Sequence, residues 1–174
     1  MNKIFWGMIF MFFNFNIDLG ATRIGLIPDF VGYMILLNGL NELSQLSNKF
    51  EQVKPYTVGM VIYTGVLYGM NLFGLSTWTV GPMTIILGII STIVYLYISY
   101  HIVMGVKDIE IENNKELNFA SLYRTWKVAA IFSLITYLLF WGPILAVVCA
   151  FVGFIATLCF IIVLNKSKNL YYSN

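Results

Sequence analysis

Six apolar stretches follow one another along the 174-residue chain, with short polar connections between them. A helix needs about 20 residues, within a range of about 17–25, to cross the hydrocarbon core of a bilayer. Hydrophobic residues make up 59% of the chain and charged residues only 10%, whereas a soluble domain averages about 25% charged residues. The surplus of apolar surface must therefore face lipid. The pattern predicts an all-α membrane protein with six transmembrane helices, at 4–18, 28–46, 55–75, 82–105, 122–141 and 144–164.

The six predicted helices form three helical hairpins within a single transmembrane domain, residues 1–174. Each return helix opens near a proline, at Pro28, Pro82 and Pro143. Proline suits the first helical turn because its missing N–H would have no partner there. The first predicted helix is short, and the second has a polar C-terminal half. An alternative is that these two form a re-entrant hairpin that does not cross the bilayer.

Basic residues favour one orientation of this arrangement. With the N-terminus inside and six crossings, only Arg23 falls on the outer side, and every other Lys and Arg falls on the cytoplasmic side: Lys3, Lys49, Lys54, Lys107, Lys115, Arg124, Lys127, Lys166 and Lys168. Cytoplasmic segments of membrane proteins carry this excess of Lys and Arg. We therefore expect a multi-pass cell-membrane protein with both termini in the cytoplasm.

The second predicted helix carries a polar face in its cytoplasmic half. Four polar residues recur at i, i+3, i+4 and i+7, and they therefore share one side of the helix: Asn38, Asn41, Glu42 and Gln45. Polar groups are costly in lipid, so this face is a candidate site. It could line a water-filled cavity or hydrogen-bond to a neighbouring helix. The alternative is an amphipathic helix end that lies among the headgroups.

Glu42 and His101 lie at similar predicted depths, each four residues from the cytoplasmic end of its helix. A carboxylate that faced lipid would be costly, so we expect Glu42 to face the interior of the bundle. His101 is its natural partner by depth, and a buried pair of this kind could handle protons. The alternative is that His101 is a polar residue satisfied near the interface.

On the predicted outer side, Asp18, Arg23 and Asp29 lie close together in sequence. Arg23 could pair with either acid. Pro28 and Asp29 are expected to begin the second helix, because a carboxylate in the first turn complements the positive end of the helix dipole. The expected role of Asp29 is therefore structural, and an outward-facing binding site is the alternative.

Small residues at a spacing of four also occur, as Gly65 and Gly69 in the third predicted helix and Ala146 and Ala150 in the sixth. Such residues let two helices approach closely. We expect both pairs to contribute to packing within the bundle.

Several functions are excluded by what the sequence lacks. It has one histidine, and it contains no HExxH, GxSxG or P-loop motif. Cys149 and Cys159 do not form a CxxC motif. The net charge of +2 is small, and the lysines are scattered, which argues against binding to nucleic acid. We therefore expect no enzymatic activity, no metal and no cofactor.

The segment GLIPDFVGYMILLNGLNEL resembles an element of small uncharacterised multi-pass membrane proteins of low-GC Gram-positive bacteria. The resemblance rests on a Pro-Asp-Phe-aliphatic-Gly-Tyr run that opens a helix, and it covers Leu26 to Leu43. It implies a bacterial plasma membrane, but it implies no activity and no functional residues.

The sequence favours a non-enzymatic accessory or interaction subunit whose partners are the lipid bilayer and either a second copy or another membrane protein. The alternative is a small transporter or channel that uses the polar face of the second helix. A cavity that reaches Glu42 would favour transport, and a packing face without a cavity would favour the accessory role.

Overall fold

The computed structural model of the protein describes residues 1–12, 16–19, 22–25, 28–73, 82–139 and 143–173. Within these ranges the chain forms helices and one small antiparallel sheet, in the order α1 (Asn2–Phe12), β1 (Asn16–Leu19), β2 (Thr22–Gly25), α2 (Asp29–Leu43), α3 (Asn48–Leu72), α4 (Pro82–Glu112), α5 (Phe119–Leu138) and α6 (Pro143–Ser173). The predicted helical class is therefore confirmed, with the β1–β2 hairpin as an addition to it.

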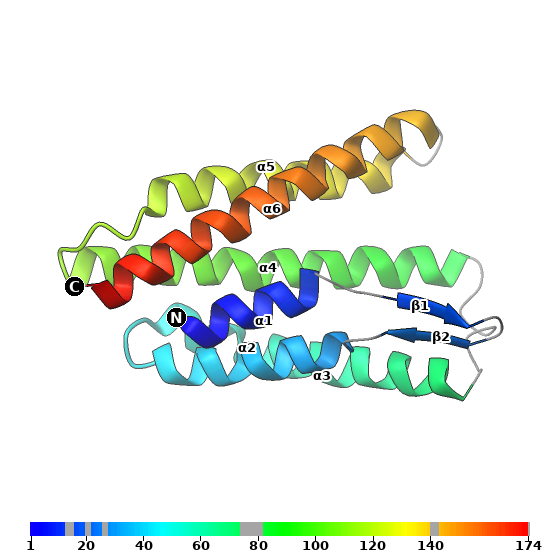
Figure 1. Ribbon diagram of the computed structural model, residues 1–174, viewed down its shortest axis with the longest axis horizontal. Coiled ribbons are helices and arrows are strands. Elements are labelled where there is room, and N and C mark those ends of the chain that lie inside the picture. Colours follow the sequence, from blue (N-terminus) through cyan, green and yellow to red (C-terminus); the bar gives the residue numbers. More distant parts are fainter. Residues whose placement is uncertain (13–15, 20–21, 26–27, 74–81, 140–142, 174) are drawn as a thin grey trace.

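All the helices run roughly along one long axis, as Figure 1 shows. Helices α1 and α2 pack together, as do α3 and α4, and α5 and α6, so three helical hairpins lie side by side. Helix α2 also contacts α3, α4 contacts α5, and α6 returns to contact α1. Both chain termini lie at the same end of the molecule, together with the α2–α3 and α4–α5 connections (Figure 1).

Two helical stretches within the described ranges are long and apolar enough to cross a membrane, Ile85–Glu112 in α4 and Ile144–Ser173 in α6. Helix α1 has 11 residues and α2 has 15, so neither reaches the length of about 20 residues that a helical crossing requires. The sequence expectation of six transmembrane helices is therefore only partly met.

The prediction of helix throughout 4–18 is wrong in its second half. Helix α1 ends at Phe12, and the chain is extended from Asn16 to Leu19, where it pairs with β2. In the register of this pair, Asp18 lies opposite Arg23. Polar residues at 14, 16 and 18 alternate with apolar ones, and this period of two suits a strand better than a helix.

Other predicted boundaries shift because the helices extend past the apolar runs. Pro55 was expected to begin the third helix but lies inside α3, which starts at Asn48. Ser47 caps α3, since its hydroxyl accepts a hydrogen bond from the Lys49 amide at 3.1 Å. The predictions that Pro28 and Pro143 mark helix starts are confirmed, because α2 begins directly after Pro28 and α6 begins at Pro143.

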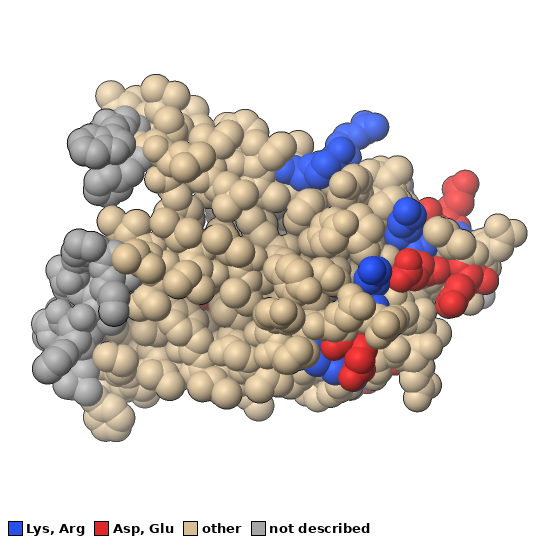
Figure 2. Space-filling model, turned by 180° about the vertical axis from the view of Figure 1, so that it is seen from behind, with Lys and Arg blue, Asp and Glu red and all other residues tan. Residues whose placement is uncertain are grey.

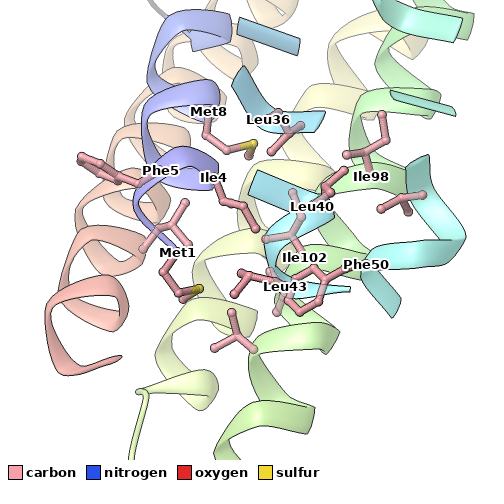
Figure 3. Close-up of a cluster of buried hydrophobic side chains, with 14 of the residues drawn as sticks. Met1, Ile4, Phe5, Met8, Leu36, Leu40, Leu43, Phe50, Ile98 and Ile102 are labelled. Carbon is pink, nitrogen blue, oxygen red and sulfur yellow. The ribbon is translucent and has the colours of Figure 1, made fainter. Parts of the chain in front are cut away.

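Helices α1 and α2 approach each other closely in the core. A Cβ atom added at Gly7 would lie 2.8 Å from the Leu36 backbone nitrogen, and one added at Gly39 would lie 2.8 Å from the Ile4 nitrogen. The two backbones therefore touch, and apolar side chains close the space around them (Figure 3). Phe50 of α3 completes this core, fully buried beside Leu43 and Ile102 (Figure 3).

Charged side chains gather at the end of the molecule that holds the termini, and the adjoining surface is uncharged (Figure 2). Large apolar side chains are exposed along the uncharged part of the helices, including Ile62 and Val66 of α3, Ile90 of α4 and Val147 of α6. In water such a surface would be unfavourable, and in lipid it is the expected one.

The α4–α5 connection at the charged end is held by side chains. The Glu110 carboxylate accepts hydrogen bonds from the backbone amides of Leu117 at 2.8 Å and Phe119 at 3.1 Å. The Ser47 hydroxyl donates to Asp108 at 2.5 Å, which joins the α2–α3 connection to α4. These contacts fix the two connections relative to each other.

Candidate functional site: a hydroxyl-lined cavity at Asp29

A cavity of about 370 Å³ lies among α1, α2, α3, α4 and α6. Its wall combines one carboxylate, Asp29, with apolar residues and a set of hydroxyl-bearing side chains: Tyr33, Tyr63, Thr64, Ser91, Thr92, Tyr95 and Thr157. The volume falls within the range of about 300–1,000 Å³ that is typical of small-molecule sites. So many polar groups around one cavity between apolar helices make it the candidate functional site.

Asp29 reaches the cavity because it is the first residue of α2. Pro28 precedes it with φ −65° and ψ 135°, the extended geometry of a residue just before a helix. The prediction that Pro28 and Asp29 open this helix is thus confirmed. Asp29 is half-buried, and its position in the first turn complements the helix dipole. Because Asp29 also lines the cavity, it is a candidate binding residue as well as a structural one.

Helix α1 ends at the same cavity, where Met11 and Phe12 form part of the wall. The last four carbonyl groups of a helix have no partner within the helix, and they carry a partial negative charge. The last turn of α1 contains no basic residue that would offset this charge. The α1 end therefore contributes a partial negative charge on this side of the cavity.

Three of the cavity hydroxyls donate their hydrogen to the backbone of their own helix. Thr64 donates to the Met60 carbonyl at 2.7 Å, Ser91 to Gly88 at 2.9 Å and Thr157 to Gly153 at 2.9 Å. A hydroxyl oxygen that donates in this way keeps its lone pairs as acceptors. These three hydroxyls can therefore serve a solute as hydrogen-bond acceptors.

A second cavity of about 320 Å³ lies among α4, α5 and α6, and it shares Thr92, Tyr95 and Thr157 with the first. Thr92 and Tyr137 lie 3.0 Å apart across the α4–α5 contact, within hydrogen-bonding distance. The shared residues place the two cavities next to each other. The polar interior thus extends from Asp29 toward the α5–α6 hairpin.

The predicted polar face of α2 lies elsewhere. Its four residues share one side of the helix, as expected, but all four are exposed: Asn38, Asn41, Glu42 and Gln45. Glu42 forms a salt bridge with Lys3 of α1, and its side chain is 48% exposed. Burial lowers the pKa of the neighbouring Met1 ammonium group to about 6, an effect that Glu42 opposes. The expectation that Glu42 faces the interior is therefore wrong.

The physical reason is that the opposite face of α2 packs better. Gly32, Leu36, Gly39 and Leu43 are buried there, and the two glycines allow the backbone of α1 to approach. The polar face must then point outward, where it lies near the charged end. This position corresponds to the amphipathic helix end that the sequence left open as an alternative.

His101 is buried, but its partners are on its own helix. Its Nδ1 atom lies 3.0 Å from the Tyr97 carbonyl oxygen, and its ring packs against Tyr97 and Tyr100 with centroids 4.3 and 5.4 Å apart. The expected pairing of His101 with Glu42 is therefore wrong, since Glu42 bonds to Lys3 instead. His101 is a polar residue satisfied near the charged end, as the second interpretation proposed.

Sequence reasoning found Asp29 but not the residues around it. Helix α3 contributes Met60, Tyr63, Thr64 and Leu67, which recur at i, i+3, i+4 and i+7. These four residues share one face of α3, and two of them, Tyr63 and Thr64, carry hydroxyl groups within an apolar run. This pattern could have been recognised in the sequence as a polar patch on one helix face. The convergence of that face on Asp29 required the arrangement of the helices in space.

No family model, curated protein or solved structure matches this chain. Within the described ranges, no group of three or more His, Cys, Asp and Glu side chains could hold a metal ion. The candidate site is therefore defined by the shape, polarity and charge of the Asp29 cavity.

Proposed function

We propose that this chain is a multi-pass protein of a bacterial plasma membrane, with its charged end and both termini in the cytoplasm. The separation of charged from apolar surface along the molecule supports this placement. The positive-inside rule gives the orientation, because Lys and Arg concentrate at the charged end.

In this proposal the first two segments cross the bilayer as part helix and part strand. The 11 residues of α1 rise about 16 Å and the four residues of β1 about 13 Å. Together these approach the hydrocarbon thickness of about 30 Å. Non-helical backbone at membrane depth requires protein around it, and the packing of β2 against α3 provides some of this cover. The remaining four helices then supply the other four crossings.

Aromatic side chains near the charged end support this depth. Tyr97 packs against Tyr56 of α3, Tyr100 packs against Trp126 of α5, and the Trp126 indole donates to Ser99 at 2.9 Å. The Lys127 ammonium lies 4.7 Å from the centre of the Tyr123 ring. Tyrosine and tryptophan concentrate at membrane interfaces, so this group fits the cytoplasmic interface.

Within this architecture, we propose that the protein is non-enzymatic and binds a small polar solute in the Asp29 cavity, as a small transporter does. The observation that carries the proposal is a carboxylate on the wall of a hydroxyl-lined cavity among apolar helices. Ionisable groups within a membrane are costly, and they characteristically mark a substrate or ion path. The sequence placed a transport site at the polar face of α2 that contains Glu42. We propose instead that the transport site is the cavity at Asp29.

A second candidate is the accessory or interaction subunit. The GxxxG pair supports it, because among the described residues a Cβ added at Gly69 would meet no atom within 4 Å, and one added at Gly65 would meet only Phe30 at 3.9 Å. No described helix therefore packs closely against α3 at Gly69. A helix of another subunit, including a second copy of this chain, could therefore approach it.

Cysteine labelling tests whether the cavity contains water. In a variant with Cys149 and Cys159 replaced by alanine, Thr64→Cys should react with a small charged methanethiosulfonate at least about tenfold faster than Val66→Cys. The reason is that a thiol must ionise to react, and ionisation needs a polar environment. Thr64 lines the cavity, whereas Val66 is 56% exposed on the lipid-facing side of the same helix. Reaction would be followed by mass spectrometry in proteoliposomes.

Equal and slow modification at the two positions would contradict the proposal, because it would mean that the cavity is dry. Faster modification of Val66→Cys would contradict the membrane placement of this face of α3.

A further inference from the structure

We propose that the groove between α4 and α5 binds an anionic phospholipid, with an acyl chain in the groove and the headgroup phosphate beside Lys127 and Arg124. This inference rests on the membrane placement in the proposed function, and it is independent of the solute that the Asp29 cavity binds. The shape of the groove, its depth in the bilayer and the two cations at its cytoplasmic end support it.

The groove has a volume of about 390 Å³ and is lined almost entirely by apolar surface. Its wall includes Ile93, Leu96 and Tyr100 of α4, and Trp126, Ala130 and Leu134 of α5. The α5 residues recur every four positions, so they form a row that rises about 12 Å along the helix. An apolar space that follows two helices in this way fits a hydrocarbon chain better than a polar solute.

The depth of the groove follows from its aromatic residues. Tyr100 and Trp126 pack together with ring centroids 5.1 Å apart, and the indole N–H is already used in a hydrogen bond to Ser99 at 2.9 Å. This pair lies at the end of the groove nearer the charged end, because α4 ends there and α5 begins there (Figure 1). Tyrosine and tryptophan favour the level of the headgroups. The groove therefore runs from the cytoplasmic interface into the hydrocarbon.

Lys127 reaches this interface from the edge of the groove. Its ammonium lies 4.7 Å from the centre of the Tyr123 ring, and Tyr123 stacks on Trp126 with centroids 6.1 Å apart. Tyr123 is one helical turn nearer the charged end, so the lysine side chain reaches back toward the headgroups. Arg124 lies three residues before Lys127 on the same side of α5, and both basic residues are exposed. The two cations thus border the cytoplasmic end of the groove.

Neither cation is neutralised by a carboxylate of the described chain. The salt bridges between described residues join Lys3 to Glu42 and Lys54 to Glu51, so Lys127 and Arg124 belong to none of them. Anionic lipids of the cytoplasmic leaflet attract basic residues that lie near the membrane surface. Arginine can also bind a phosphate through two parallel hydrogen bonds. A headgroup with a net negative charge therefore complements this end of the groove.

A second apolar groove, of about 330 Å³ between α3 and α4, differs from the first in its charge. Its wall includes Pro55 and Gly59 of α3 and Leu87 of α4. The cation next to Pro55 in the sequence is Lys54, and it already pairs with Glu51. Both grooves could hold an acyl chain, but we expect selection of an anionic headgroup at the α4–α5 groove and not at this one.

Quenching of Trp126 fluorescence by brominated lipids tests the proposal. A variant with Trp6→Phe, Trp78→Phe and Trp141→Phe keeps Trp126 as its one tryptophan. It is placed in mixed vesicles of phosphatidylcholine and phosphatidylglycerol, in which one lipid or the other carries bromine on its acyl chains. Bromine quenches a tryptophan that it contacts, so the two series give the relative affinity of the lipids at Trp126. We expect phosphatidylglycerol to be preferred at least about fivefold, the effect expected of one basic residue near an anionic surface.

Three variants locate the origin of this preference. Arg124→Gln combined with Lys127→Gln should bring the preference to near one, while brominated lipids still quench Trp126. Lys166→Gln combined with Lys168→Gln is the matched control, because it removes two positive charges from α6 instead, and it should leave the preference unchanged. Ala130→Phe fills the groove and keeps both cations, and it should also lower the preference. Gel filtration and circular dichroism establish that each variant is folded.

The outcomes separate this inference from the proposed function. If neither brominated lipid quenches Trp126, this surface does not face lipid and the proposed membrane placement fails. If both lipids quench equally, the placement stands and the binding of an anionic phospholipid is wrong. A preference that survives the loss of Arg124 and Lys127, or that falls equally in the α6 control, overturns the role of the two cations. A preference that survives Ala130→Phe overturns the position of the acyl chain in the groove.

Discussion

Replacing Phe50 with alanine is expected to lower the free energy of unfolding by about 3–5 kcal/mol, the range found for buried Phe→Ala substitutions. Phe50 is fully buried, and its ring lies over Gly105 of α4 so closely that a Cβ there would overlap it. Removing the ring leaves a hole at the junction of α2, α3 and α4 (Figure 3). The measurement is denaturant or thermal unfolding in detergent micelles.

Phe73→Ala is the matched control, because it removes the same ring from the other end of α3. Phe73 is 82% exposed, so its loss should change the free energy of unfolding by no more than about 0.5 kcal/mol. Equal effects of the two substitutions would show that the Phe50 core does not hold these helices together.

Gly7→Ala is expected to destabilise the fold by about 1–3 kcal/mol, the usual effect of overpacking a core. The added Cβ would lie 2.8 Å from the Leu36 nitrogen and 2.9 Å from the Gly32 oxygen. Both are backbone atoms, so α1 and α2 must move apart to make room. Unfolding in micelles measures this loss, and a cysteine pair bridging α1 and α2 should cross-link more slowly.

Gly59→Ala provides the opposite case in α3. Within the part of the chain that the structure describes, a Cβ at Gly59 meets no atom within 4 Å, and alanine is a better helix former than glycine by up to about 1 kcal/mol. This variant should therefore be neutral or slightly more stable. A Gly7→Ala protein as stable as Gly59→Ala would contradict the close approach of α1 to α2.

The all-helical character of α3 to α6 was predictable from the sequence, because a long apolar run favours a helix over other secondary structure. Helix starts at Pro28 and Pro143 were also predictable, since proline and a first-turn acid have local physical effects. The β1 strand was not predicted, because its polar residues were interpreted as interruptions of a helix. A strand of four residues leaves too short a pattern to outweigh the apolar run around it.

The orientation of α2 shows what periodicity cannot decide. The spacing of Asn38, Asn41, Glu42 and Gln45 correctly placed them on one face, but it did not say whether that face points inward. Gly32 and Gly39, seven residues apart on the buried side, were the informative signal, because only glycine lets the α1 backbone approach. The GxxxG pair at Gly65 and Gly69 drew attention to packing in α3, where the described residues make no close helix contact through Gly69.

The candidate cavity illustrates a second limit. Asp29 was identified from its place in the chain, and the sequence assigned it a structural role. The cavity exists because residues from α3, α4 and α6 converge on it, among them Thr64, Tyr95 and Thr157. These residues are far apart in sequence, and each alone is ordinary in a membrane helix. Only the packing of the helices brings them together.

The account depends most on the charged end lying in the cytoplasm, and thiol labelling of intact cells tests this directly. Single cysteines at Asn48, Asn113, Ser173 and Thr79 would be introduced after Cys149 and Cys159 are replaced by alanine. Asn48, Asn113 and Ser173 are exposed at the charged end, so they should resist an impermeant thiol reagent until the membrane is opened. Thr79 lies between α3 and α4 in the sequence, in the predicted outer connection, and it should react at once. Labelling of Asn113→Cys from outside intact cells, with Thr79→Cys protected, would contradict the proposed orientation.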